Sequence, residues 1–158
     1  MTLPKSFAAV LLLASLCVLS CKKDKIETPP DTTSLFVFTG GGSIPNVESK
    51  TLQITADGSY VITQKNNEKS TRKLPANVQD SLKPYLSSFP RAAIKADPNT
   101  YSSRGALDAG YQAFIYVEKN PADTTAIYLD IPLGSVPAYF IEFERKINQT
   151  IINNKIFN

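Results

Sequence analysis

The order of apolar and polar positions predicts strands in the first half of the chain. Residues 34–39, SLFVFT, indicate a short strand. Residues 49–65, SKTLQITADGSYVITQK, indicate two strands joined by a turn at Asp57-Gly58. A further short strand is possible at residues 70–74, STRKL. The pattern therefore predicts a β-rich first half built around a hairpin.

Two registers are compatible with this first hairpin. A two-residue loop at Asp57-Gly58 would pair Leu52 with Thr63. A three-residue loop, with Gly58 in the left-handed conformation, would pair Leu52 with Ile62. We favour the second register because it places the large apolar side chains on one face.

The second half alternates between helical and strand patterns. Residues 75–89 place apolar side chains at helical spacing, and Pro84 predicts a kink or two short helical pieces. Residues 111–119 and 124–132 are β-rich and, joined by NPAD, predict a second hairpin. The last helix is expected to begin near Ser135 as N-cap, with a proline in its first turn. Its predicted buried face comprises Phe140, Phe143, Ile147 and Ile151.

The sum of these elements predicts an α+β fold. We expect an antiparallel sheet built from hairpins, with helices packed on one face, in a single small domain at residues 34–158. Residues 90–110 show little periodicity and indicate a long loop. That loop is either a functional excursion or a tolerated insertion, and we prefer the second interpretation.

The N-terminal residues indicate export and a lipid anchor. FAAVLLLASLCVL, residues 7–19, is apolar but too short to span a bilayer. It leads into VLSC, which resembles a bacterial lipobox that would make Cys21 the lipidated first residue. A conventional secretory signal with a chance cysteine, or an uncleaved anchor, is the weaker alternative. We expect a signal peptide at residues 1–20 and fatty acyl chains, such as palmitate, on Cys21.

The residues after Cys21 fit a tether. Residues 22–33, KKDKIETPPDTT, are charged and contain two prolines, so residues 21–33 are expected to link the lipid flexibly to the domain. Lys22, instead of an aspartate, resembles lipoproteins that are passed on to the outer membrane. We expect a bacterial envelope protein that is anchored in the outer membrane. The domain would lie either on the periplasmic side of that membrane or on the cell surface.

Composition excludes several kinds of chemistry. The chain contains no histidine, which removes histidine-based catalysis and the common zinc sites. Cys17 leaves with the signal peptide and Cys21 takes the lipid, so no free thiol is expected. The 17 basic residues only slightly outnumber the 14 acidic ones, which does not indicate nucleic-acid binding.

Glycosidases use a pair of carboxylates, and no spacing of acidic residues in this chain singles out such a pair. Glu142 and Glu144 are expected as solvated charges beside the apolar helix face, and Asp130 on the polar side of a strand. We therefore expect no enzyme, no metal and no cofactor. The remaining candidates were Asp108 and Glu118.

Three consecutive glycines in FTGGGSIPN, residues 38–46, suggest a phosphate loop at first sight. Such a loop opens a helix, so that backbone N–H groups face the anion. Here the glycines lead toward a predicted strand, and no GKS or GKT follows. A nucleotide site is therefore not expected. An ordinary connection between an edge strand and the hairpin is the plain interpretation.

The order of several short motifs resembles emfourin, the protein inhibitor of protealysin and related thermolysin-like metallopeptidases. These motifs are GGSIP after the first strand, LQITADGSYVI in the hairpin, and DAGYQAFIYV before the last helix. The resemblance covers most of residues 35–152. It implies an inhibitor that occupies the peptidase cleft, with the apolar side chain of Ile44 in the specificity pocket. The partner-binding residues so implied are Gly40, Gly41, Gly42, Ser43, Ile44 and Pro45.

A second function belongs to another class. The domain would then be a surface binding module for a polysaccharide or for a partner lipoprotein. Aromatic side chains exposed in a row on one sheet face would favour the binding module. An exposed, rigid loop at residues 40–46 would favour the inhibitor. The tyrosines of the predicted strands have core-compatible spacing, and packing is their preferred role.

Overall fold

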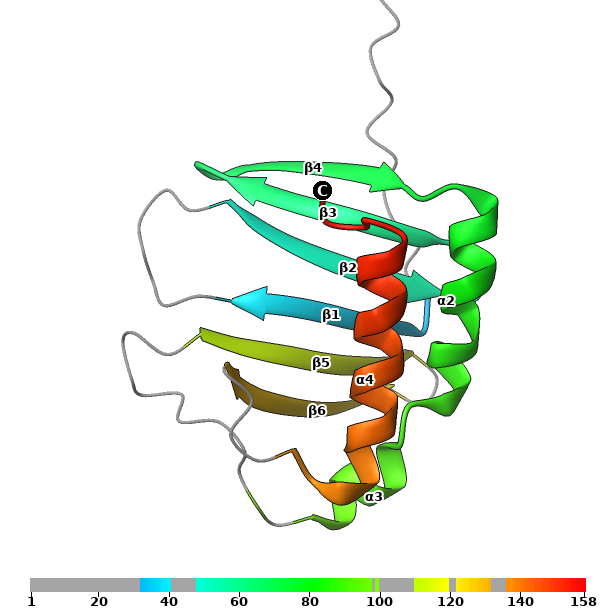
Figure 1. Cartoon of the computed structure of the whole chain (residues 1–158), viewed down its shortest axis with the longest axis vertical. Coiled ribbons are helices and arrows are strands. Elements are labelled where there is room, and N and C mark those ends of the chain that lie inside the picture. The colour runs from blue at the N-terminus through cyan, green and yellow to red at the C-terminus, as the bar shows by residue number, and fades with distance from the viewer. Residues whose placement is uncertain (1–31, 41–47, 98, 100–109, 120–121, 132–135) are drawn as a thin grey trace, which may run out of the picture.

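The chain folds into a six-stranded antiparallel sheet with helices on one face, which confirms the predicted α+β class (Figure 1). The fold is that of a computed structural model, which describes residues 32–40, 48–97, 99, 110–119, 122–131 and 136–158. The strand order is β4-β3-β2-β1-β5-β6. The strands are β1 Ser34–Gly40, β2 Ser49–Thr55, β3 Ser59–Lys65, β4 Glu68–Lys73, β5 Gly110–Lys119 and β6 Ala122–Ile131.

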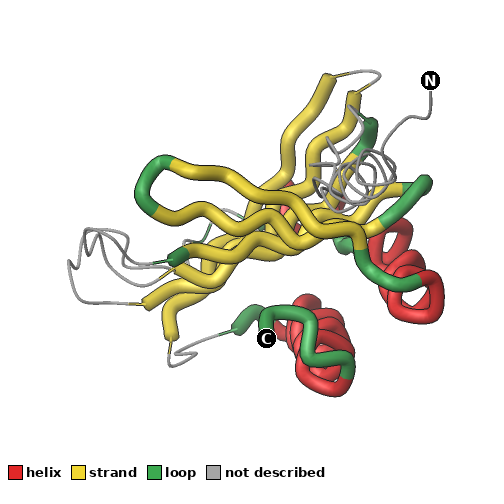
Figure 2. Tube along the Cα trace, turned by 90° about the horizontal axis from the view of Figure 1, so that it is seen from above, coloured by secondary structure: helices red, strands yellow, loops and turns green. Residues whose placement is uncertain are grey.

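Three helices complete the described fold: α2 Ala76–Ser88, α3 Arg91–Ala96 and α4 Ala138–Asn153. Seen along the sheet, α2 and α4 lie on the same side of the strands (Figure 2). The ion pairs of α3 with Glu118 and Asp123 place it on that side too. Helices α2 and α4 also pack against each other, where the Tyr85 ring meets that of Phe143 at 5.8 Å. The result is a two-layer domain with the core between sheet and helices.

The core forms because each strand turns alternate side chains toward the helices. On central β1 these are Leu35 and Val37, both fully buried. Beside them, Phe114 of β5 meets Phe140 of α4 with ring centroids 5.1 Å apart in a T-shaped arrangement. The predicted face of the last helix is confirmed, since Phe140, Phe143, Ile147 and Ile151 are all buried.

The first hairpin has a register that neither interpretation predicted. Leu52 pairs with Val61, and the turn is closed by a backbone hydrogen bond from Thr55 to Gly58 of 2.8 Å. The Thr55 hydroxyl also accepts hydrogen bonds from the N–H groups of Asp57 and Gly58. Gly58 does not have a positive φ, so the predicted left-handed conformation is wrong. A threonine side chain stabilises this turn where a left-handed glycine was expected.

The β3–β4 hairpin is tighter than its sequence suggested. Lys65 pairs with Glu68, which leaves a two-residue loop of Asn66 and Asn67. Their φ values are 49° and 66°. Two left-handed residues are typical of the type I′ turn, whose twist matches that of a hairpin, and asparagine tolerates this conformation.

Three helix predictions need correction. Residues 76–88 form a single helix that includes Pro84, so the alternative of two short helical pieces is wrong, while a kink stays a prediction. Residues 91–96, expected within a loop, form α3. Helix α4 begins at Ala138 with Pro137 as its N-cap in an extended conformation, a little later than predicted. A proline favours that position because its fixed φ and missing N–H cost nothing before the first turn.

We predict that two isoleucines on α4 differ sharply in their contribution to stability. Ile147 is 0 % exposed and Ile152 is 68 % exposed. Ile147→Ala should lower the free energy of unfolding by about 2–5 kcal/mol, because it leaves a cavity. Ile152→Ala, the matched control, should change it by less than about 0.5 kcal/mol. Urea unfolding measures both, and similar losses would contradict the placement of α4.

Candidate binding face of the sheet

The sheet has a second face that none of the described helices covers (Figure 2). Because side chains alternate, Phe36 and Phe38 of β1 point to this face while Leu35 points to the helices. We call it the open face. By the strand registers it contains, among others, Ser49, Thr51, Tyr60, Ile62, Gln64, Lys69, Thr71, Lys73, Tyr111, Ala113, Ile115, Ala126, Tyr128 and Asp130.

Three aromatic rings follow one another across the open face. Phe38 of β1 lies 5.6 Å from Tyr111 of β5, centroid to centroid, and Tyr111 lies 6.4 Å from Tyr128 of β6. The planes of neighbouring rings are tilted by 48° and 49°. All three side chains are half-buried. We call Phe38, Tyr111 and Tyr128 the aromatic row.

Polar and charged groups lie at the other side of the open face. Lys69 and Lys73 extend from the edge strand β4, and the Lys73 ammonium lies 5.9 Å from the centre of the Tyr60 ring. Tyr60 itself is only 6 % exposed. Packing is thus the role of Tyr60, as expected for strand tyrosines. Tyr111 and Tyr128 are half-buried and lie on the open face, outside the helix-covered core.

A separate ionic cluster ties α3 to the second hairpin on the helix-covered face. Arg91 forms ion pairs with Glu118 and with Asp123, and Lys95 pairs with Asp123. The Arg91 guanidinium also lies over the Tyr116 ring at 4.7 Å from its centroid. The charges of the cluster balance, so it fixes α3 in place rather than attracting a ligand.

These contacts shift two pKa values in the cluster. The hydrogen bond from Lys95 is the main reason why the pKa of Asp123 lies below its ordinary value. The hydrogen bond to Glu118 raises the pKa of Arg91. Both shifts favour the charged forms that make the ion pairs.

The carboxylates considered as catalytic candidates do not meet in one place. Glu118 belongs to the ionic cluster, Asp130 lies on the open face, and Glu142 pairs with Lys146 one turn along α4. Asp108 lies outside the described residues. Three or more potential metal ligands do not come together anywhere in the described part of the chain.

Glu144 differs from its prediction as a solvated charge, since it is only 8 % exposed. It lies four residues after Phe140 and three before Ile147, so the helical period turns it toward the sheet. Its carboxylate accepts a hydrogen bond from Asn148, whose amide exchanges hydrogen bonds of 2.8 and 3.2 Å with Gln112 of β5. These amides stabilise the buried carboxylate.

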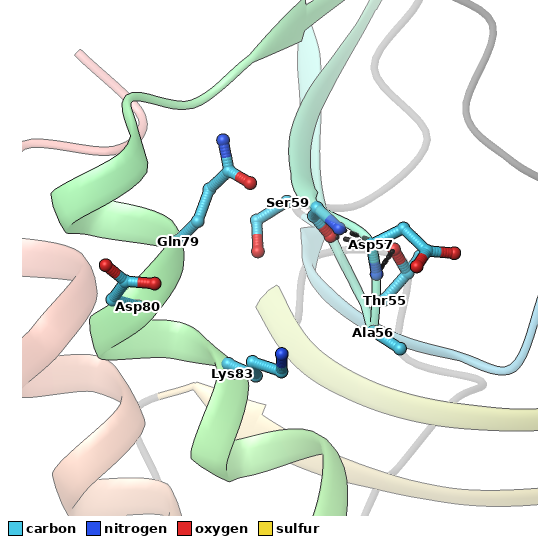
Figure 3. A pocket seen from close by; sticks show the side chains of 8 residues that line it. Thr55, Ala56, Asp57, Ser59, Gln79, Asp80 and Lys83 are labelled. Atoms are coloured by element: carbon cyan, nitrogen blue, oxygen red, sulfur yellow. Dashed lines mark hydrogen bonds between the residues drawn. The ribbon is translucent and has the colours of Figure 1, made fainter.

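A polar pocket of about 210 Å³ lies between the β2–β3 turn and α2 (Figure 3). Its lining is Thr55, Ala56, Asp57, Gly58, Ser59, Gln79, Asp80 and Lys83. The lining mixes carboxylates with an ammonium group and has no aromatic ring. Gln79 donates its amide hydrogen to the backbone of Leu74, so part of the lining already serves the fold.

Several predicted functional residues lie outside the described part of the chain. These are Cys21 and the segment Gly41 to Pro45. Gly40 is described as the end of β1, where it pairs with Tyr111. β1 is a central strand, so the connection that follows it does not leave from an edge strand. No helix within the described ranges is long and apolar enough to cross a membrane.

The aromatic row was missed although the sequence contained a signal for it. In YQAFIYV, Tyr111, Ala113 and Ile115 alternate with the core side chains Phe114 and Tyr116. A strand with apolar residues at both odd and even positions has two apolar faces.

Comparison of the whole chain with protein-family models, curated proteins and solved structures found no match.

The ionic cluster should make stability depend on pH. A lowered pKa for Asp123 contributes stability above the unfolded pKa of about 4, and this contribution is lost as the pH falls through the folded pKa. Asp123→Asn should therefore lower the melting temperature at pH 7, and the difference from wild type should shrink toward pH 2. Asp80→Asn, on the exposed side of α2, is the control and should show little effect at either pH.

Proposed function

We propose that this chain is a non-catalytic binding protein that holds a glycan on the open face of its sheet. The single observation that supports this proposal is the aromatic row, which crosses three adjacent strands on a face without a described helix. A row of exposed aromatic side chains on one sheet face is the feature expected of a binding module, and here the three rings of the row are half-buried.

The chemistry of the face suits a carbohydrate. The apolar C–H faces of sugar rings pack on aromatic rings, and their hydroxyl groups need donors and acceptors nearby. Phe38 and Tyr111 provide the first kind of surface. Thr51 and Gln64, on neighbouring strands of the same face, provide the second.

We also propose that the domain is tethered to the cell envelope. The lipobox-like VLSC and the charged segment after it support lipidation of Cys21 and anchoring in the outer membrane. A tether of this kind keeps a binding domain close to the polysaccharides of the envelope, and the gain in local concentration compensates for weak affinity at each site.

Removal of one ring tests the proposal. Tyr111→Ala should weaken binding to the preferred polysaccharide about tenfold, which corresponds to about 1.4 kcal/mol. Tyr139→Ala is the matched control, because Tyr139 is 36 % exposed but lies on α4. Affinity electrophoresis through gels that contain single polysaccharides measures both variants. Equal retention of wild type and Tyr111→Ala in every gel would exclude the aromatic row as a glycan site.

Inhibition of a secreted thermolysin-like metallopeptidase is a second candidate. The emfourin resemblance supports this candidate, and so does one observation. The strands that precede and follow the implied inhibitory loop, β1 and β2, are both paired within the sheet. Gly40 pairs with Tyr111, and Ser49 pairs with Gln64. A segment held at both ends loses less conformational freedom when it binds.

Ile44→Asp tests the inhibitor hypothesis. A carboxylate in an apolar specificity pocket costs several kcal/mol, so inhibition should be largely lost while circular dichroism stays that of wild type. Titration of peptidase activity with increasing protein measures the effect. Absence of inhibition by the wild-type protein at micromolar concentration, against several such peptidases, would remove this candidate.

A further inference from the structure

We infer that the glycan held by the open face is acidic, with its carboxylates paired to Lys69 and Lys73 of β4. This inference rests on the proposed function and narrows it to a class of ligand. Three observations support it. The two lysines lie on the open face, and most acidic side chains lie on other surfaces. A continuous track of side chains runs between β4 and the aromatic row.

The two lysines point to the same face as the aromatic row. Lys69 pairs with Gln64 and Lys73 pairs with Tyr60, both of which belong to the open face. Within the described part of the chain, neither ammonium group has an ion pair. Both side chains are exposed. They are therefore available to an anion from solution.

Most acidic side chains lie away from this face. Glu118 and Asp123 are engaged by Arg91 and Lys95 on the helix-covered face. Glu142 is paired along α4. Among the residues described, Asp130 is the carboxylate that the strand registers place on the open face, at the far side from β4. β4 itself carries Lys69, Arg72 and Lys73 against one acidic residue, Glu68, which the register turns to the opposite face, so the field near β4 is positive.

A continuous track of side chains joins the lysines to the aromatic row. From β4 inward, the registers place Thr71 beside Ile62, Ile62 beside Thr51, and Thr51 beside Phe38. Neighbouring strands are about 4.8 Å apart, so the distance from β4 to β1 is about 14 Å. One oligosaccharide that crosses the strands can therefore contact the lysines and the rings together.

The spacing of the lysines favours a polymer with repeated charges. They are four residues apart on one strand, about 13 Å at 3.3 Å per residue. A single phosphate group cannot bridge that distance, whereas a polyuronic acid presents carboxylates along its length. An anionic membrane is less suitable, because the most exposed large apolar side chains, Tyr139, Ile141 and Ile152, lie on α4 behind the sheet.

Binding of the mature protein, purified from membranes in detergent, to polygalacturonate and to dextran tests the inference. Polygalacturonate should bind, and 0.5 M salt should abolish most of the binding because exposed ion pairs are screened. The double variant Lys69→Gln/Lys73→Gln should bind about tenfold more weakly, because both exposed ion pairs with the carboxylates of the polymer are lost. Lys83→Gln/Lys155→Gln removes the same charge from α2 and from the turn after α4, and should bind like wild type.

Other outcomes separate the inference from the proposed function. Equal binding of dextran and polygalacturonate, with loss in Tyr111→Ala, would overturn the acidic ligand and keep the glycan site. An equal loss in both lysine double variants would reduce the effect to net charge and overturn the pairing. Binding to vesicles of phosphatidylglycerol but to neither polysaccharide would overturn both. Melting temperatures of the variants establish that each has folded.

Discussion

The position of β1 between β2 and β5 is the constraint on which the rest of the molecule depends. Each half of the sheet is a set of hairpins, and only β1 joins them. Because the strand is central, both its edges are hydrogen-bonded, and this strand carries apolar side chains on both of its faces. Leu35 and Val37 complete the core beneath the helices, while Phe36 and Phe38 give the opposite face its aromatic character. One short apolar run thus determines both the core and the candidate site.

The sequence was sufficient for the elements whose period is simple. The strand at residues 34–39, the second hairpin and the buried stripe of α4 follow from alternation and from helical spacing. The hairpin register failed because the side chain of Thr55, rather than a left-handed Gly58, closes the turn. The aromatic row was missed for a different reason: which face of a strand the helices cover is decided by tertiary packing, and strand periodicity is the same for either choice.

The charged side chains on the two faces of the sheet differ in their surroundings, and one set has a structural role while the other has the proposed binding role. On the helix-covered face, Arg91 and Lys95 form ion pairs with Glu118 and Asp123. These contacts fix α3, a helix that no periodic pattern in the sequence predicted. On the open face, Lys69 and Lys73 extend from an edge strand, where lysine also discourages pairing with the edge of another molecule. In the proposed function, the same two residues would protect the sheet edge and attract an anion.

The pairing of β1 with β5 also determines when the domain can form. Phe36 pairs with Ile115, so the first strand to leave the ribosome waits for one that is made much later. Contacts between such distant residues fold slowly, because a long loop must close before they form. For a chain that crosses a membrane unfolded, late closure is an advantage, since no stable half-sheet obstructs the translocation channel. For the export proposed above, the topology that builds the open face would thereby also delay the folding of the newly made chain.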